Sequence, residues 1–164
     1  MTETILKMQK KVKRYLDKDR YDHTIGVMHT AGCLAMRYGA NLEQALTAGL
    51  LHDCAKCVPA DEKIKLCEKN HIEISDAEYK NPGLLHAKLG AFFARKKYGI
   101  ENEEILRSIE SHTTGRPNMS LLDKIIYIAD YIEPGRDVAP NLPEVRALAF
   151  VDIDACLYRI LEDT

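Results

Sequence analysis

Apolar residues recur at intervals of three or four positions along most of this chain, and this spacing constrains the fold more than any other feature. Near the start, Ile5, Met8, Val12 and Tyr15 follow the pattern. Such spacing places side chains on one face of an α-helix. We find no run in which apolar and polar residues alternate, as they do in a half-buried β-strand. The sequence therefore predicts an all-α protein that folds as a compact helical bundle.

Further segments show the same periodicity, and turn-forming residues separate them. The predicted helices cover residues 24–38, 41–52, 85–98, 105–112, 121–132 and 154–161. Gly39 and Gly99 are typical helix stops, and Asn41 can cap the helix that follows it. Proline and glycine mark residues 57–60, 81–83, 115–117 and 134–143 as connections between helices. Because there is no repeat or low-complexity linker, residues 1–164 are predicted to form a single domain.

The composition and the charge argue against several classes of partner. Hydrophobic residues make up 46% and charged residues 29%, as in ordinary soluble proteins, and a net charge of −2 gives no broad attraction to nucleic acids or acidic membranes. No apolar stretch approaches the ~18 residues of a membrane span. The start lacks a signal-peptide pattern, and five cysteines without framework spacing are typical of reduced thiols. We expect a cytoplasmic protein with no nucleic-acid or membrane partner.

The dyad His52-Asp53 ends the apolar run 45–51, where buried polar groups need compensation. A single inward histidine is usually a satisfied core residue, and a single aspartate near a helix end usually caps or solvates something. Here several such residues occur together, most of them at helical spacing from apolar neighbours. The ordered set is His23, His52, Asp53, His86, His112 and Asp130. Imidazole and carboxylate groups in this number predict a site for one or two metal ions.

The types of ligand indicate the metal and the chemistry. Asp53 and Asp130 are predicted near the C-terminal ends of apolar helices, where the helix dipole disfavours a carboxylate by roughly 0.3–1 kcal/mol. A bound cation would reverse that penalty. Nitrogen and oxygen ligands favour iron, manganese or a similar divalent ion over a closed zinc site. The two oxygens of Asp53 could bridge two ions, which predicts hydrolysis by a metal-activated hydroxide.

A second metal hypothesis involves the cysteines. Cys54 and Cys57 form a CxxC pair, and Cys67 and His71 are four residues apart on an expected helix, so these four could make a Cys3His zinc site. The spacing is loose, and the pair overlaps the end of the His52-Asp53 helix. A redox role for the CxxC pair has no support either, because the βαβ context that usually accompanies it is missing.

Two basic residues are candidates for binding phosphate. Lys56 follows Asp53 by three residues, although a surface lysine is an equally good interpretation from position alone. Arg136 follows the Asp130 helix by one tight turn, which could bring its guanidinium back over the metal site. Glycine near His86 and His112 would let backbone amides approach an anion. There is no P-loop, GxGxxG or GxSxG motif, so nucleoside triphosphate folds and serine hydrolases have no support.

Taken together, these motifs resemble the HD-domain metal-dependent phosphohydrolases, and more narrowly the YqeK family, the symmetrical diadenosine tetraphosphate hydrolases of bacteria. The segments that carry the resemblance are 20–24 (RYDHT), 49–56 (GLLHDCAK), 83–87 (GLLHA), 111–115 (SHTTG) and 127–136 (YIADYIEPGR). The last segment is far more specific than the HD dyad alone. The resemblance spans residues 20–136 and predicts an HD-domain helical bundle.

The resemblance implies a reaction, a metal and roles for particular residues. Diadenosine tetraphosphate and water would give two ADP, with iron as the metal. It implies metal ligation by His23, His52, Asp53 and Asp130, and it places His86 and His112 at a second metal position or on the nucleotide phosphates. It also implies nucleotide contacts from Arg136 and from the stretch Gly83, Leu84, Leu85 and His86, with His23 and His112 beside the substrate.

In this interpretation Asp53, Lys56, His86 and His112 form the catalytic set. ADP or GDP is the expected product-like ligand, and a homodimer is compatible with the sequence, which indicates no interface. One alternative is another HD-domain phosphohydrolase, acting on nucleoside monophosphates or deoxynucleotides. Another is a catalytically silent nucleotide-binding module. A cyclic-dinucleotide phosphodiesterase of the HD-GYP kind has less support, because no Gly-Tyr-Pro follows an HD segment.

Overall fold

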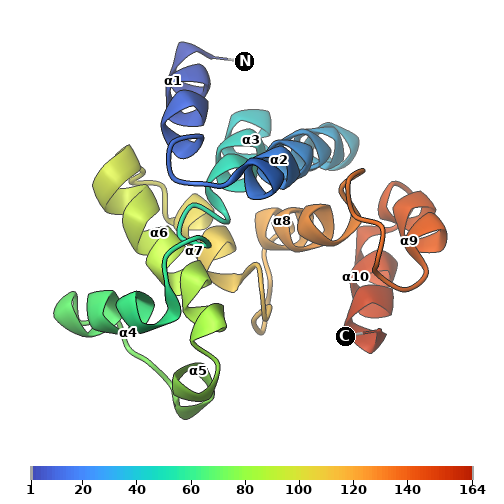
Figure 1. Ribbon diagram of the computed structural model, residues 1–164. Coiled ribbons are helices and arrows are strands. Elements are labelled where there is room, and N and C mark those ends of the chain that lie inside the picture. Colours follow the sequence, from blue (N-terminus) through green and yellow to red (C-terminus); the bar gives the residue numbers. More distant parts are fainter. Residues whose placement is uncertain (1, 164) are drawn as a thin grey trace.

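The computed structural model describes residues 2–163, and within them every regular element is helical (Figure 1). The α-helices are α1 (Glu3–Val12), α2 (Lys18–Tyr38), α3 (Leu42–Leu51), α4 (Ala60–Lys69), α5 (Asp76–Lys80), α6 (Leu85–Tyr98), α7 (Glu103–Ser111), α8 (Leu121–Ile132), α9 (Leu142–Ala149) and α10 (Ile153–Glu162), and a short 3-10 helix, η1 (Pro82–Leu84), precedes α6. The predicted all-α helical bundle is confirmed. Among these helices, none combines the length and the apolar character that a bilayer span requires.

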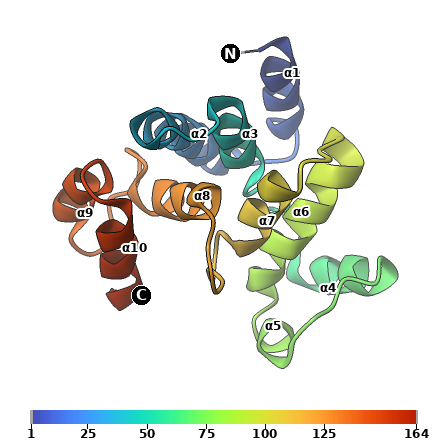
Figure 2. The same ribbon diagram turned by 180° about the vertical axis from the view of Figure 1, so that it is seen from behind.

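Helix α8 lies at the centre of the bundle. Figures 1 and 2 show it between the pair α2 and α3 and the pair α9 and α10, and α7 also packs against it. Ile125, Ile126, Ile128 and Ala129 are fully buried. A helix that is apolar on most of its faces can be stable only where neighbours surround it. Asp130, whose side chain is 23% exposed, therefore lies near the end of one of the most apolar helices of the chain.

Helices α2 and α3 form a closely packed hairpin. The side chain of Asp17 caps α2 by accepting a hydrogen bond from the Arg20 amide (2.8 Å), and Asn41 caps α3 in the same way through the Gln44 amide (3.0 Å). At Gly49 a Cβ atom would stand only 2.9 Å from Met28 Cα, so a glycine is needed for this close approach. The contact brings the end of α3, and with it His52, close to His23 on α2.

Two hydrophobic cores meet at the HD dyad. The larger core includes Leu50 and Leu51, and a smaller core between α4 and α6 includes Cys54 and Ala55. His52 and Asp53 belong to neither core, although they are 0% and 2% exposed. A polar site therefore lies where the two cores join.

Some predicted boundaries were wrong. The predicted connection 134–143 is too long, because α9 begins at Leu142 with a proline in its first turn. Helices α5 and α9 were not predicted. Helix α5 is only five residues long and rests on a local capping box between Ser75 and Glu78. His71 was expected on a helix, but it lies beyond the end of α4 with a φ of 55°.

Candidate metal centre

Three of the clustered histidines are fixed by hydrogen bonds to the backbone of their own segments. The Nδ1 atoms of His52, His86 and His112 lie 2.7, 2.6 and 2.7 Å from carbonyl oxygens three residues earlier in the chain. Because a carbonyl can only accept, each Nδ1 carries the hydrogen and each Nε2 keeps a free lone pair. These rings therefore present Nε2 as a potential metal ligand.

His23 is held in the same orientation by a side chain. Its Nδ1 lies 3.0 Å from Oε1 of Glu133, a carboxylate that is 4% exposed. The other oxygen of Glu133 accepts a hydrogen bond from the Gly135 amide at 2.6 Å. A carboxylate behind a ligating imidazole fixes the ring and raises its basicity. The sequence reasoning missed Glu133, although it lies inside the segment 127–136.

Asp53 stands at the centre of the histidines, and its two oxygens face different partners. Oδ2 lies 3.4 Å from His52 Nε2 and 3.9 Å from His23 Nε2. Oδ1 lies 3.1 Å from His86 Nε2 and 3.6 Å from His112 Nε2. The carboxylate therefore divides the cluster into an Oδ2 half and an Oδ1 half, which is the geometry that a bridging ligand requires.

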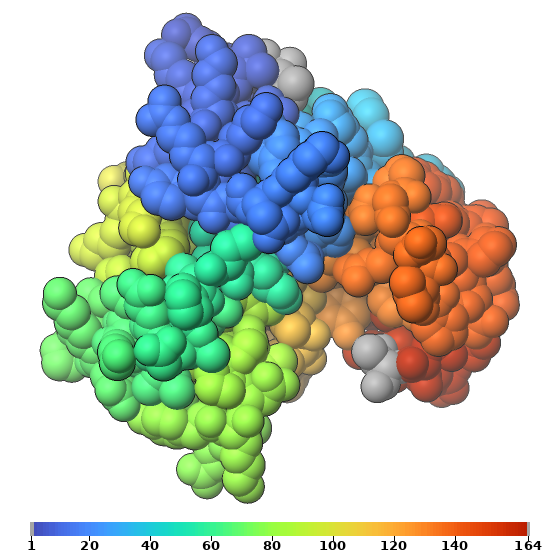
Figure 3. Space-filling model, in the orientation of Figure 1, coloured from blue at the N-terminus to red at the C-terminus, as the bar shows by residue number. Residues whose placement is uncertain are grey.

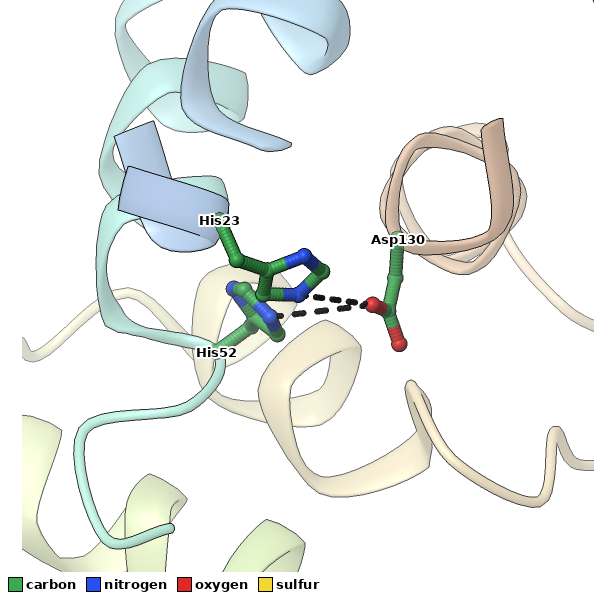
Figure 4. A group of neighbouring side chains, drawn as sticks. All are labelled: His23, His52 and Asp130. Atoms are coloured by element: carbon green, nitrogen blue, oxygen red, sulfur yellow. Dashed lines mark ion pairs between the residues drawn. The ribbon is translucent and has the colours of Figure 1, made fainter. Parts of the chain in front are cut away.

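Asp130 completes the Oδ2 half. Its Oδ1 lies 3.1 Å from His23 Nε2 and 4.0 Å from His52 Nε2, and Figure 4 shows the three side chains converging from α2, the end of α3 and α8. The ligand atoms of His23, His52 and Asp130 all lie within 4.8 Å of one another. The same holds for His52, Asp53 and His112. The structure thus brings together all six side chains that the sequence singled out.

Unpaired polar atoms indicate that the cluster fits a cation. His23 Nε2, His52 Nε2 and Asp53 Oδ1 are buried without a hydrogen-bond partner. In addition, the Nε2 atoms of His86 and His112 face each other at 3.1 Å, and each ring already donates through Nδ1. Buried polar atoms without partners are costly, and a divalent ion would satisfy several of them at once.

The electrostatics of the cluster keep its two carboxylates ionised. Burial alone would raise the pKa of Asp53, but the imidazoles of His52 and His112 outweigh it and hold that pKa well below its usual range. Burial alone would raise the pKa of Asp130, but the imidazole of His23, whose Nε2 lies 3.1 Å from Oδ1, outweighs it and lowers that pKa. Burial lowers the pKa of His86 and so favours its neutral form. Burial would also lower the pKa of His23 and His112, but Asp130 and Asp53 outweigh it and raise both. A metal ion would therefore displace a proton from these rings when it binds.

Three cationic side chains surround the cluster. The Lys56 ammonium lies 4.0 Å from Asp53 Oδ1 and 3.3 Å from His86 Nε2, and Arg136 Nη2 lies 2.9 Å from Asp130 Oδ1, so both residues lie beside the cluster. The third, Arg20, places Nη1 2.9 Å from Asp53 Oδ2. Sequence reasoning assigned Arg20 no role, although it precedes His23 by one helical turn.

A cavity of about 630 Å³ opens beside the Oδ2 half, lined in part by Arg20, His23 and Arg136. Figure 3 looks onto this face, where blue residues at the start of α2 border the orange loop after α8. A smaller cavity of about 300 Å³ is lined by Leu84 and Thr113, and Thr113 Oγ1 lies within 3.3 Å of both His86 Nε2 and His112 Nε2. Thr113 is a further residue that the sequence reasoning missed.

The stretch predicted to contact nucleotide lies at the start of α6. The Gly83 carbonyl holds His86, and Leu84 lines the smaller cavity. Leu85, however, is fully buried in the smaller core and lines neither cavity.

The structure gives the cysteine site no support. Cys54 and Cys67 are packed in the smaller core, whereas Cys57 is exposed and its Sγ lies 3.4 Å from Asp17 Oδ2. Burial raises the pKa of Cys54 to about 12, which keeps it a neutral thiol. The groups of metal-ligand atoms found within residues 2–163 contain no cysteine.

Comparisons with known proteins bear on this geometry. The family described as "HD domain" matches residues 20–135. The chain is 42% identical to a "Bis(5'-nucleosyl)-tetraphosphatase, symmetrical" of Bacillus subtilis (strain 168), over 93% of this chain and 81% of that protein. It is 44% identical, with the same coverage, to a protein of that name from Halalkalibacterium halodurans.

A solved structure is similar over nearly the whole chain. It is described as a "predicted HD superfamily hydrolase involved in NAD metabolism" and comes from Clostridium acetobutylicum. The TM-score is 0.91 and the sequence identity is 45%, over 95% of this chain and 82% of that one. The six clustered side chains all lie within the residues that the HD domain matches.

Proposed function

The chain belongs to the HD-domain family, and from that premise we propose that it is a symmetrical bis(5'-nucleosyl)-tetraphosphatase that hydrolyses diadenosine tetraphosphate to two ADP. Relatives that carry this name are 42% and 44% identical over 93% of the chain. The observation that carries the proposal is the position of Asp53, whose two oxygens face separate pairs of imidazoles.

The two halves of the cluster define two proposed ion positions. His23, His52, Asp130 and Asp53 Oδ2 would hold one ion, and Asp53 Oδ1 with His86 and His112 would hold the other. A bound divalent ion supplies Lewis acidity and lowers the pKa of water near the phosphate. Iron is our proposal for the metal, and manganese is an alternative with the same preference for nitrogen and oxygen ligands.

Basic side chains on both sides of the cluster favour cleavage in the middle of a polyphosphate. Arg136 lies at the Asp130 end, and Lys56 lies at the His86 end. A tetraphosphate lying across the cluster would therefore meet a cation on each side of the scissile bond. Arginine matches phosphate oxygens in a bidentate fashion, whereas lysine acts as a point charge. Water would add to one of the two central phosphorus atoms and the other half would leave as ADP, which is already stabilised as an anion, so no strong general acid is needed.

Nucleotide contacts are proposed for the residues that line the two cavities. His23 and Arg136 line the larger one, and Leu84 lines the smaller one beside His86 and His112. A dinucleoside polyphosphate has two nucleoside ends, and cavities next to the two halves of the cluster would take one end each. ADP is the product-like ligand expected at either place.

The test is product analysis with protein loaded separately with Fe²⁺ under anaerobic conditions and with Mn²⁺. Diadenosine tetraphosphate should give ADP as the sole nucleotide product, at two molecules per substrate. Formation of ATP and AMP, or no turnover with either metal, would reject symmetrical cleavage. A parallel panel of nucleoside monophosphates and deoxynucleotides should show much slower turnover, and the reverse ranking would indicate another HD-domain phosphohydrolase.

A further inference from the structure

Arg20 contacts the central carboxylate of the cluster. It lies in the first turn of α2, and its Nη1 lies 2.9 Å from Asp53 Oδ2. Its side chain is 33% exposed, and the exposed part lines the cavity of about 630 Å³. The guanidinium of Arg20 therefore contacts the central carboxylate of the site and also lines the cavity beside it.

The oxygen that Arg20 binds is one that a metal ion would need. Asp53 Oδ2 lies 3.4 Å from His52 Nε2 and 3.9 Å from His23 Nε2, and both of these Nε2 atoms lack a hydrogen-bond partner. An ion coordinated by these three atoms would compete with the guanidinium for the same oxygen. Two positive charges would also repel each other across that short distance.

Because most charged groups around the cavity are acidic, binding of a polyanion there would depend on its two arginines. Asp17, Asp19 and Asp137 line the cavity with exposed carboxylates, and buried Glu133 lines it as well. Against these acidic groups stand two guanidiniums, Arg20 and Arg136. Phosphates would be repelled by such a rim unless the guanidiniums faced them and a metal ion added further positive charge.

We propose that Arg20 is a phosphate-binding residue. When a divalent ion binds Asp53 Oδ2, the guanidinium of Arg20 would leave that oxygen and bind a substrate phosphate instead. Arginine suits this exchange because its planar fork binds carboxylate and phosphate with the same geometry. The inference rests on the proposed function, since it assumes a phosphate-bearing substrate in this cavity. It adds a coupling: metal binding and phosphate binding strengthen each other through one side chain.

The test compares Arg20→Gln with wild type in two calorimetric titrations, one with Mn²⁺ and one with ADP or inorganic tripolyphosphate on the Mn²⁺-loaded protein. Mn²⁺ should bind about threefold or more tightly to the variant, because a competing cation has been removed. ADP and tripolyphosphate should bind at least about fivefold more weakly, because a charge-assisted hydrogen bond has been lost. The two changes therefore have opposite signs.

Lys18→Gln is the matched control. Lys18 lies in the same helical turn and pairs with Asp22 on the exposed surface, away from Asp53. Lys18→Gln removes the same positive charge as Arg20→Gln, and the affinities for Mn²⁺ and for the phosphate probes should stay within about twofold of wild type. Loss of both affinities in Arg20→Gln would assign Arg20 a structural role and overturn the inference.

Other outcomes separate this inference from the proposed function. Unchanged ADP and tripolyphosphate affinity in Arg20→Gln, with wild type cleaving diadenosine tetraphosphate symmetrically, would reject the inference alone. Opposite changes in the two affinities, with wild type failing to cleave that substrate, would reject the proposed function and leave the phosphate role of Arg20 standing. Wild-type protein that binds neither Mn²⁺ nor the phosphate probes would overturn the inference.

Discussion

At the scale of single residues, the carboxylate of Asp53 determines how the site is arranged. It is 2% exposed, and its oxygens contact imidazoles, a guanidinium and an ammonium group from several helices. A carboxylate buried to this extent is stable only when positively charged groups lie close to it. The neighbouring histidines are equally constrained, since each ring is fixed through Nδ1.

Asp53→Asn should therefore lower both metal content and hydrolysis. The amide keeps the volume of the side chain but provides one weaker oxygen ligand and a nitrogen that cannot bind metal. We expect activity to fall by at least about 100-fold, because replacing even residues behind the ligands typically costs 10–100-fold. Elemental analysis and an ADP-release assay measure the two effects. Full metal content with wild-type rates would show that Asp53 is not a ligand.

Glu133→Ala tests the residue that orients His23. The substitution leaves His23 Nδ1 without its acceptor at 3.0 Å, so Nε2 loses its fixed tautomer and direction. Metal affinity should fall about 10–100-fold. Glu144→Ala, an exposed change in the first turn of α9, is the control and should leave metal affinity unchanged. Equal affinity in Glu133→Ala and wild type would contradict an orienting role.

The sequence predicted which side chains cluster better than it predicted the residues that contact them. His52, Asp53, His86 and His112 were identifiable because polar residues interrupt apolar helical stripes. Arg20, Thr113 and Glu133 lie next to predicted ligands in the sequence, but each occupies a position where a polar residue is ordinary. Their roles depend on distances between α2, the end of α7 and the end of α8, which local patterns do not encode.

At the scale of helices, close packing of α2 on α3 positions His23 and His52. Gly49→Ala should push these helices apart, because the new Cβ would stand 2.9 Å from Met28 Cα, a backbone atom that cannot rotate away. We expect a loss of about 1–3 kcal/mol in the free energy of unfolding, together with weaker metal binding. Denaturant unfolding and metal titration measure these effects.

Gly32→Ala is the control on the same pair of helices. There a Cβ would meet Leu46 Cδ2 at 2.9 Å, and the end of a leucine side chain can rotate away. The variant should be near wild type in stability and in metal affinity. Equal damage from the two variants would contradict the role given to Gly49.

Helix α5 depends on Glu78, and its contribution should change with pH. Burial raises the pKa of Glu78, but the Lys88 ammonium at 2.8 Å and the hydrogen bonds from Ser75 outweigh it and lower that pKa. A lowered pKa in the folded state stabilises the protein above the unfolded pKa of about 4.3, and this stabilisation is lost as the pH falls through the folded value.

Glu78→Gln should therefore destabilise the protein by about 1–2 kcal/mol at pH 7. The difference from wild type should shrink steadily below pH 4.5, because wild-type Glu78 then also becomes neutral. Urea unfolding at several pH values measures it. A difference that stays constant down to pH 3 would show that charge on Glu78 contributes nothing.

The helices that the sequence predicted are those with a long apolar stripe. Residues 85–98 and 121–132 coincide with α6 and α8 because apolar residues run along their whole length. Helix α5 and the start of α9 depend instead on a capping box and on the left-handed backbone of Asn141. Such local devices carry little apolar periodicity, so the pattern did not reveal them.

At the scale of the whole molecule, the site joins two hydrophobic cores, so metal should stabilise the fold as a unit. The proposed ligands come from α2, α6 and α8 and from the ends of α3 and α7. An ion at 100 times its dissociation constant adds about 2.7 kcal/mol to the free energy of unfolding. The thermal midpoint should therefore rise with Mn²⁺ and fall on chelation, and Asp53→Asn should abolish most of the change.

The most direct test is a crystal structure of the Mn²⁺-loaded protein with anomalous scattering measured at the manganese edge. We predict a peak at about 2.0–2.3 Å from His23 Nε2, His52 Nε2 and the facing oxygens of Asp53 and Asp130. A second peak between Asp53 Oδ1, His86 and His112 would complete the arrangement. Anomalous density elsewhere on the molecule, with none among these side chains, would contradict the account.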